Sequence, residues 1–415
     1  MKKKIYLLLA VIFLIFIGLG SANALLGSSW PAISAEIGVN ISLQGILTTI
    51  IYLMGTIGAA NAKALIARFN TWLPISIGVA MVAVAVLWFS YLHGFVFMAV
   101  CGAILGFFNG IAVSSVNGYV AKHYTASAMN WLHCSYAAGC AIGPAIISYF
   151  ILTQDSWRMG YRVDAGMVFV VFVILALSFR LWKAHEPGAP GRAAIAAEAT
   201  EADTASKDVP ATPPPKPLSN RELLRLPEGV AIPLIMFVFA SFEVVIFFWT
   251  TSFLTVEKGM TPGAAAGMMA FFFGAQIASR FVCGFLAMKF SDRVVIRIAM
   301  PVALAGVVAL IFAPDSLIVL CLVVIGAAAG PTFPLLIHEV PSIVGKENAQ
   351  GIIGLQMAAA NLGTALAPLL MGVIAGIAGF KVFPVYLIVL IALSIVLKIA
   401  QYRRMSDSGG LLQRP

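Results

Sequence analysis

The chain has 415 residues, of which 61% are hydrophobic and only 10% are charged, and its net charge is +9. Soluble domains carry about 25% charged residues and about 45–50% apolar ones. This composition excludes a soluble enzyme, a nucleic-acid-binding module, a disordered scaffold and a disulfide-stapled secreted domain. The five cysteines lie in apolar runs and form no Cys-x-x-Cys pair, so we expect packed free thiols.

Apolar runs separated by charged or turn-forming residues predict the membrane spans. One helical crossing takes about 20 apolar residues, so the chain has room for twelve. Twelve runs occur, in two sets of six. We therefore predict an all-α integral membrane protein with twelve transmembrane helices in two pseudo-symmetric six-helix bundles. The predicted spans are residues 5–27, 43–66, 73–91, 94–119, 130–152 and 164–183, then 229–254, 263–287, 294–313, 316–339, 349–377 and 380–402.

The stretch between the two sets of spans is rich in proline. Residues 185–228 include eight prolines, three of them consecutive at 213–215. A segment of this composition cannot bury a core, so we predict a flexible linker, with a short surface helix starting near residue 219. The predicted units are residues 1–184 (N-terminal bundle), 185–228 (linker), 229–403 (C-terminal bundle) and 404–415 (tail).

Basic residues are distributed unevenly between the two sides of the predicted topology. With the N-terminus in the cytoplasm, 21 of the 26 Lys and Arg residues fall on the cytoplasmic side, four outside and one, Arg280, within a span. Cytoplasmic loops of membrane proteins carry such an excess. The bias predicts a multi-pass membrane protein with both termini in the cytoplasm, and the membrane that we expect is a bacterial inner membrane. It also explains the net positive charge without a nucleic-acid partner.

The start of the chain also resembles a secretory signal. Three lysines, an apolar run and Ala22-Asn23-Ala24 form a pattern that signal peptidase can cleave. Cleavage would leave eleven spans without changing the orientation of the later ones. Because the spans divide as six plus six only if the first one is retained, we expect an uncleaved first span.

Small residues four positions apart recur at matching places in the two sets of spans. Such residues share a helix face and let two helix backbones approach closely. We expect these faces to pack helices, and their recurrence is typical of transporters built from repeats. They are Gly102, Gly106, Gly110, Gly139 and Gly143-Pro144 in the first half, and Gly326, Gly330, Gly363 and Ala367-Pro368 in the second.

With these features, the sequence resembles the major facilitator superfamily. That family carries a signature of the form Gly-x-x-x-Asp-Arg/Lys-x-Gly-Arg/Lys in the loops after spans two and eight. Here residues 63–72 read Lys-Ala-Leu-Ile-Ala-Arg-Phe-Asn-Thr-Trp, and residues 284–293 read Gly-Phe-Leu-Ala-Met-Lys-Phe-Ser-Asp-Arg. Both copies keep the basic residue, and both lack the acidic one. The resemblance implies gating roles for Arg68, Lys289 and Asp292, with a weakened charge latch.

Two further stretches resemble the fucose–proton symporter branch and its bacterial sugar-porter relatives. One is Met129-Asn130-Trp131-Leu132-His133, which leads into Gly139 and Gly143-Pro144. The other is Glu243-x5-Trp249, followed by Ala278-Ser279-Arg280-Phe281. The Gly139-x-x-x-Gly143-Pro144 element is also similar to a motif of drug–proton antiporters, but the glycine pair that should follow is absent. The resemblance therefore implies a sugar porter first and an antiporter second.

Few ionisable residues lie within the predicted spans, and each is a functional candidate because charge is costly there. Glu243 lies near the middle of span seven and is the predicted proton-coupling residue; a structural ion pair is the alternative. Arg280 lies nearer the cytoplasmic end of span eight, where we expect a gating or water-bridged contact with Glu243, or snorkelling to the interface. His133 is a second coupling candidate, or a structural histidine. We expect His338 and Glu339 at a cytoplasmic gate or the interface.

Neutral amides and aromatic side chains within the spans suit a hydroxyl-rich solute, because amides both donate and accept hydrogen bonds. Interhelical hydrogen bonds and lipid-facing rings are the alternatives. The resemblance implies that spans one, four, seven and ten line the cavity, which favours Asn23, Asn109, Glu243 and Trp249. The full set of predicted substrate-binding residues is Asn23, Trp30, Asn109, Asn117, Trp249, Gln276, Gln356 and Asn361.

The sequence predicts a secondary transporter that moves a small polar solute, such as a sugar or polyol, by alternating access with protons. Proton-driven efflux of amphipathic compounds is one alternative, and organic-anion transport through Arg280 is another. Neither a metal site nor a nucleophile triad or nucleotide-binding motif occurs in a fitting context, so we expect no enzyme activity and no cofactor. The predicted partners are the solute, the proton and the lipid bilayer, with the chain acting as a monomer.

Overall fold

The computed structural model describes residues 2–124, 126–183, 220–286 and 289–407. Within these ranges all regular structure is helical, and twelve helices are long and apolar enough to cross a membrane, which confirms the predicted fold class. The elements are α1 (Lys2–Ile37), η1 (Ile41–Leu43), α2 (Gln44–Phe69), α3 (Trp72–Phe89), α4 (Phe95–His123), α5 (Ala126–Gln154), α6 (Trp157–Leu177), α7 (Phe179–Lys183), α9 (Asn220–Leu223), α10 (Pro227–Val256), α11 (Pro262–Leu286), α12 (Asp292–Phe312), α13 (Asp315–His338), α14 (Val340–Val344), α15 (Lys346–Ala378) and α16 (Val382–Asp407).

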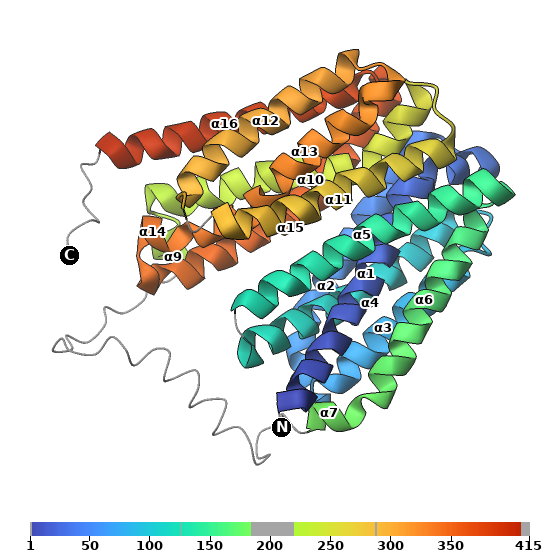
Figure 1. The fold of residues 1–415 in the computed structure, drawn as a ribbon, viewed down its shortest axis with the longest axis horizontal. Helices are drawn as coiled ribbons and strands as arrows, with labels where there is room; N and C mark the ends of the chain where they lie inside the picture. The colour runs from blue at the N-terminus through green and yellow to red at the C-terminus, as the bar shows by residue number, and fades with distance from the viewer. Residues whose placement is uncertain (1, 125, 184–219, 287–288, 408–415) are drawn as a thin grey trace.

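The helices form two bundles, α1–α6 and α10–α16, which lie against each other (Figure 1). We call the end that carries Lys2, α7, α9 and the end of α16 the terminal side, and the other end the opposite side. The bundles touch at the opposite side and separate toward the terminal side (Figure 1). Residues 185–219, most of the predicted linker, lie outside the described residues.

Close packing at glycines repeats in both bundles. In the first bundle, α5 crosses α1 through Gly139 and Gly143, and α4 crosses α2 through Gly106. In the second, α15 crosses α10 through Gly363, and α13 crosses α11 through Gly326. At each glycine an added Cβ would collide with a backbone carbonyl oxygen of the partner helix. The small residues predicted from sequence therefore lie at equivalent helix crossings in the two bundles.

Two helices differ from their predicted boundaries by more than the others do. The first span continues past residue 27 to Ile37, and Gly38 then reverses the chain with φ +68°. The sixth span begins at Trp157 rather than at 164, because the Ser156 side chain caps it by accepting a hydrogen bond from the Met159 amide. This earlier start moves Arg158 and Arg162 from the predicted loop onto the first turns of α6, and it places Asp164 two turns inside the helix.

Large apolar side chains cover the outer surface of the bundles. On α16, for example, exposed valine, leucine and isoleucine side chains recur every three or four residues along one face, as a lipid-facing helix requires. The exposed residues of α16 are Val385, Val389, Leu393, Val396 and Ile399.

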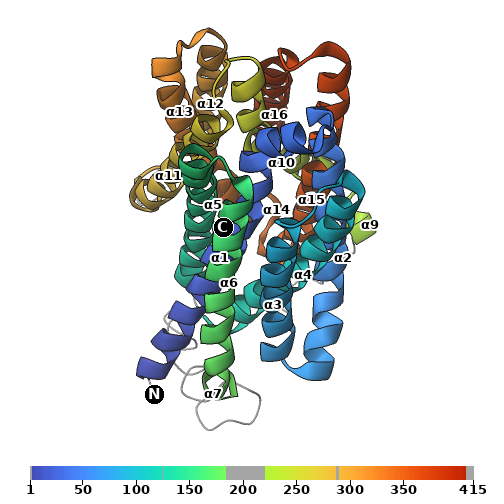
Figure 2. The same ribbon diagram turned by 90° about the vertical axis from the view of Figure 1, so that its right-hand side faces the viewer.

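α1 lies between α5 and α6 at the inside of its bundle (Figure 2). Its buried side chains form the middle of the N-terminal core.

The two bundles make their closest contacts near the opposite side. The Gln44 side chain at the start of α2 donates to the Phe248 carbonyl on α10 at 2.6 Å and accepts from the Ser252 hydroxyl at 2.9 Å. The Thr49 hydroxyl donates to the Ala365 carbonyl on α15 at 2.8 Å. These buried hydrogen bonds join α2 to α10 and α15, so they hold the opposite side closed in this conformation.

Candidate functional site

Glu243, Gln276 and Arg280 form a polar cluster midway along the C-terminal bundle. Glu243 projects from the middle of α10, and its Oε1 accepts a hydrogen bond from the Gln276 amide on α11 at 2.8 Å. The Arg280 guanidinium, one turn further along α11, lies 4.0 Å from the same oxygen. The expected water-bridged contact between Arg280 and Glu243 is thus a direct, long ion pair. Both side chains keep about one fifth of their surface exposed.

Gly330 on α13 makes room for this cluster. A Cβ at position 330 would lie 2.5 Å from the Ser279 hydroxyl and 2.8 Å from the Gln276 carbonyl oxygen, both on α11. With glycine at this position the two helices approach closely, and Arg280 Nε donates to the Gly330 carbonyl at 2.8 Å. One predicted packing glycine therefore positions the guanidinium beside Glu243.

The N-terminal bundle presents further polar groups to the cluster. The Asn23 amide on α1 donates to the Tyr52 hydroxyl on α2 at 3.5 Å, and the Tyr52 ring packs edge-on against Phe248 of α10. Tyr52 lies within electrostatic range of Glu243, and His133 of α5 lies within range of Arg280. The two predicted coupling residues and Arg280 are thus brought near one another across the boundary between the bundles.

A small cavity lies at the same boundary. Its volume is about 20 Å³, which is enough for a single water molecule. Asn23 is its polar neighbour from α1, and Phe248 closes it from the C-terminal bundle. The lining residues are Ala22, Asn23, Leu26, Ile51, Ala85, Val86, Phe89, Leu105, Tyr161 and Phe248.

The other predicted amides are distributed along two helices, α4 and α15. Asn109 on α4 keeps a buried carbonyl oxygen without a partner, which leaves it able to accept a hydrogen bond. Asn117 donates to the Val113 carbonyl of its own helix at 3.0 Å. Gln356 on α15 is buried and donates to Leu336 at 2.9 Å, nearer the terminal side, whereas Asn361 is exposed. None of these four contacts the Glu243 cluster among the described hydrogen bonds.

The two predicted tryptophans lie in packed cores instead of near Glu243. Trp30 is fully buried toward the opposite end of α1, and its indole N–H donates to the Ile41 carbonyl at 2.7 Å, which fixes the turn between α1 and α2. Trp249 is also fully buried, and its ring packs against Phe380. Both positions suit a structural role, because neither ring has a free face.

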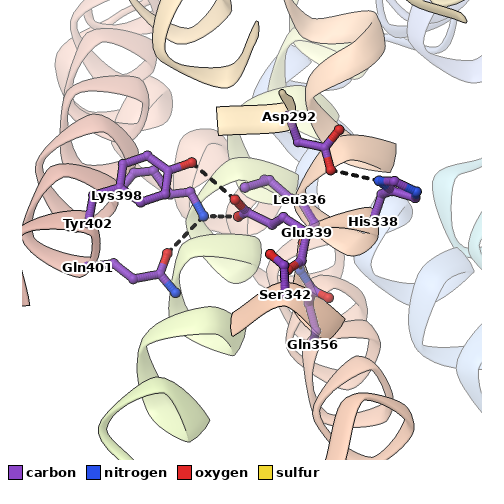
Figure 3. A network of polar contacts seen from close by, with 9 residues as sticks. All are labelled: Asp292, Leu336, His338, Glu339, Ser342, Gln356, Lys398, Gln401 and Tyr402. Carbon is purple, nitrogen blue, oxygen red and sulfur yellow. Dashed lines mark hydrogen bonds and ion pairs between the residues drawn. The ribbon is translucent and has the colours of Figure 1, made fainter. Parts of the chain in front are cut away.

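A second polar network lies within the C-terminal bundle at the terminal side (Figure 3). Glu339, just after α13, forms a buried ion pair with Lys398 of α16 and accepts a hydrogen bond from the Tyr402 hydroxyl at 3.1 Å. Lys398 also donates to Gln401 at 2.8 Å. Lys398 is one of the 21 basic residues counted on the predicted cytoplasmic side, and it lies inside the bundle instead of in a loop, with 3% of its surface exposed.

The gating residues predicted in the two signature loops, Arg68, Lys289 and Asp292, lie at the terminal side, and no described contact joins them across the gap between the bundles. Asp292 at the start of α12 pairs with His338 at the end of α13, 2.7 Å apart, within the same bundle (Figure 3). Arg68 stacks over the neighbouring Phe69 ring. Lys289 is exposed. The weakened charge latch expected from the sequence stays a prediction.

Asp164 is a buried carboxyl that the sequence reasoning missed. It lies on α6, has no exposed surface and accepts a hydrogen bond from the Ser21 hydroxyl of α1. The predicted start of the sixth span at 164 placed it at the membrane surface, where an acidic residue needs no explanation. The signal that could have found it is Ser156, whose capping propensity begins the helix two turns earlier.

The central cluster combines an acidic group, an amide and a guanidinium within contact of one another. Glu243 has one cation at a long distance and one amide donor, so protonating it would release both Arg280 and Gln276 for other partners. No group of three or more metal-ligating side chains occurs in the described part of the chain.

Comparison with known proteins agrees with the fold. The profile described as Major Facilitator Superfamily matches residues 9–349 and 232–409. No curated protein sequence matches the chain. Among solved structures, the chain is similar to a D-xylose-proton symporter, with a TM-score of 0.73 and 15% identity over 96% of this chain and 97% of that one.

A second similar structure is described as a bacterial homolog of the human lysosomal transporter Spinster, in an inward-facing and unoccupied conformation. Its TM-score is 0.70 at 13% identity, and the match covers 97% of this chain and 98% of that one. At these identities the structures support the fold, whereas the profile match spans nearly the whole sequence. The chain is a multi-pass membrane transporter, not an enzyme, and it belongs to the major facilitator superfamily.

Proposed function

We propose that the protein is a proton-coupled transporter that moves a small polar solute, such as a sugar or polyol, by alternating access between its two bundles. The observation that carries this proposal is the Glu243–Gln276–Arg280 cluster, which combines one acidic group, one amide and one cation at the middle of the bundle. An ionisable group at this depth is costly to maintain and marks a pathway for an ion or substrate.

Coupling to protons follows from the balance of charges at Glu243. With the carboxylate ionised, Arg280 at 4.0 Å offsets its charge. With the carboxyl protonated, Arg280 keeps only its bond to the Gly330 carbonyl and becomes a partly buried cation without a counter-charge. The two protonation states therefore favour different arrangements of α10 and α11. A conformational change that separates these groups would accompany binding or release of the proton.

A polar, uncharged solute suits the remaining groups. Asn23, Tyr52 and Gln276 supply neutral donors and acceptors around the boundary between the bundles. The similarity to a D-xylose-proton symporter supports a sugar and a proton as the first pair to test. Arg280 favours an organic anion as the second candidate. In the described structure its Nη groups make the long ion pair with Glu243 and no hydrogen bond, so they can still bind an anion.

The orientation is part of the proposal. The excess of basic residues supports a terminal side that faces the cytoplasm, and the membrane that we propose is a bacterial inner membrane. Since the bundles touch at the opposite side, the present conformation is then the inward-facing one, in a chain that acts as a monomer.

Transport by the purified chain in proteoliposomes tests the proposal. A thermal-shift screen first compares sugars, polyols, organic acids and lipophilic cations at two pH values, because a ligand of the folded state raises its apparent stability. Uptake of the stabilising compounds, and of D-xylose, is then measured with and without a proton gradient. We expect Glu243→Gln to abolish gradient-driven accumulation and to retain exchange of solute across the membrane.

Glu228→Gln is the matched control, because Glu228 lies in the first turn of the same helix, away from the cluster. It should transport like the native chain. Full gradient-driven accumulation by Glu243→Gln would refute the coupling role. Export of lipophilic cations without sugar uptake would establish the antiporter alternative, and gradient-driven uptake of organic acids alone would establish the anion alternative.

A further inference from the structure

Asp164 lies where three helices of the N-terminal bundle meet. It projects from α6, the helix that packs beside α1 and α5 (Figure 2), and neither Asp164 nor its partner Ser21 has more than 1% of its surface exposed. From Trp157, the first residue of α6, it lies about 10 Å into the helix at 1.5 Å per residue. The carboxyl is therefore enclosed by protein within a membrane-spanning segment.

The carboxyl has fewer partners than an ionised carboxylate needs. Its Oδ1 accepts a hydrogen bond from the neutral Ser21 hydroxyl, while its buried Oδ2 has no hydrogen-bond partner. An ionised carboxylate can accept about four hydrogen bonds. One neutral donor does not offset the several kcal/mol that removing a carboxylate from water costs.

The charged groups on α1 and α6 are directed elsewhere. Glu36 pairs with Arg158 at 2.7 Å, about 22 Å along α1 from Ser21 at 1.5 Å per residue. Arg162 lies only two positions from Asp164, but residues two apart project from different faces of a helix. Its guanidinium lies over the Tyr91 ring, 4.7 Å from the ring centre.

α3 and α5 also pack against α6 and supply no compensating charge, and the basic residues of α7 lie beyond the far end of α6, about 20 Å along the helix from Asp164. α3 contains no ionisable residue, and the one on α5 that can carry positive charge is His133. His133 lies about 15 Å along α5 from Gly143, the residue that packs against Ser21. Asp164 thus has no cation beside it from any described element that packs against its helix. The neutral acid is the form that this site accommodates at the lowest cost.

We propose that Asp164 is a second proton-binding site, separate from Glu243, that holds a proton in the conformation seen here. A carboxylic acid at this position has one hydrogen-bonded oxygen and no net charge to stabilise. The site includes the turn of α1 that also borders the central boundary between the bundles. Protonation of Asp164 can therefore affect transport through this turn. The influence of Asp164 on transport rests on the proposed proton-coupled function, whereas the protonation of Asp164 does not.

The connection runs through one turn of α1. Gly20 packs against the Tyr136 carbonyl of α5, Ser21 contacts Asp164, and Asn23 bonds Tyr52 beside the central cavity. Solute bound near Asn23 would move this turn and with it the Ser21 hydroxyl. Loss of that donor removes the one hydrogen bond of Asp164, so the protonation of Asp164 and the position of α1 depend on each other.

Infrared spectroscopy of the purified full-length chain tests the protonation directly. A protonated carboxylic acid has a carbonyl stretching band that an ionised carboxylate lacks. We expect this band at neutral pH, its loss in Asp164→Asn, and a shift of the band in Ser21→Ala, which removes the hydrogen bond but keeps the acid. Asp155→Asn is the matched control, because Asp155 is exposed in the turn before α6.

A spectrum of Asp164→Asn that matches the Asp155→Asn spectrum would overturn the proposal. Glu243→Gln separates the two sites, because any band from Glu243 disappears in that variant and the Asp164 band persists. Ser21→Ala keeps the test decisive if Asp164→Asn does not fold, since an unshifted band would also overturn the assignment.

A conformational readout that needs no known substrate tests the coupling. In a cysteine-free background, Thr49→Cys and Ala365→Cys report closure of the opposite side by their cross-linking rate. We expect Asp164→Asn to remove part of the pH dependence of this rate, and Asp155→Asn to retain all of it. Identical pH profiles for the two variants would refute the coupling between Asp164 and closure of the opposite side. That outcome would affect neither the infrared result nor the proposed function.

Discussion

Lys398 and Glu339 form a buried ion pair in which each charge compensates the other. The side chains of Lys398 and Glu339 are only 4% and 3% exposed, so removing one partner leaves an uncompensated charge inside the bundle. We expect Lys398→Met to destabilise the protein by about 3–5 kcal/mol. Replacing both residues, as in Lys398→Met with Glu339→Gln, should recover most of that loss, because no buried charge then remains. Thermal unfolding in detergent measures the difference.

Lys381→Met is the control for this prediction. Lys381 is exposed in the turn before α16, and surface substitutions of this kind change stability by no more than about 0.5 kcal/mol. If Lys398→Met unfolds at the same temperature as Lys381→Met, the pair does not stabilise the bundle. A double variant as unstable as the single one would show that packing of the lysine stem matters more than its charge.

The sequence revealed individual charged residues better than it revealed their partners. Glu243 and Arg280 stand out because each interrupts an apolar run. Whether the two side chains meet depends on how α10 and α11 are rotated about their axes, which the sequence does not specify. Lys398 and Glu339 lie near the predicted ends of their spans, where charged residues are common, so sequence position gave no sign that they are buried together. Asp164 was hidden by a helix boundary wrong by two turns.

Glycines at helix crossings control how closely the elements of each bundle approach. A Cβ at Gly106 would overlap the Ile51 carbonyl oxygen of α2, whereas a Cβ at Gly118 on the same helix would meet nothing within 4 Å. We expect Gly106→Ala to destabilise the protein by about 1–3 kcal/mol, because the two backbones must separate. Gly118→Ala should be neutral or stabilising by up to about 1 kcal/mol, since alanine favours the helix.

The second bundle offers the same comparison at its equivalent crossing. Gly326→Ala on α13 would strike the Phe272 carbonyl of α11, and Gly274→Ala on α11 meets open space. Melting temperatures of the four variants test both halves together. Equal effects of Gly326→Ala and Gly274→Ala would contradict the close packing of α13 on α11.

Helix pairing was predictable from the sequence to the extent that small residues recur at four-residue spacing. The spacing identified which faces of spans four, five, ten and eleven pack closely. It could not identify the partner helices, because the same glycine face accommodates any neighbouring backbone. The partners α2, α1, α11 and α10 follow from the three-dimensional arrangement of each bundle.

At the scale of the whole molecule, the contacts that close the opposite side must open once in every transport cycle. The Thr49–Ala365 hydrogen bond is one of these contacts, at 2.8 Å between α2 and α15. We expect oxidation of the Thr49→Cys, Ala365→Cys variant to join the two bundles and to abolish transport, and a reducing agent to restore it. The physical reason is that a bond of fixed length prevents the bundles from separating at this end.

The locked chain should still bind solute, because its central cluster lies on the open side of the closed contact. Ligand binding in the cross-linked state therefore separates a block in conformational change from damage to the site. The single variants Thr49→Cys and Ala365→Cys serve as controls, since neither can form the bridge and both should transport after oxidation. Undiminished transport by the cross-linked chain would mean that the bundles do not separate between α2 and α15, and alternating access would then require opening between another pair of helices.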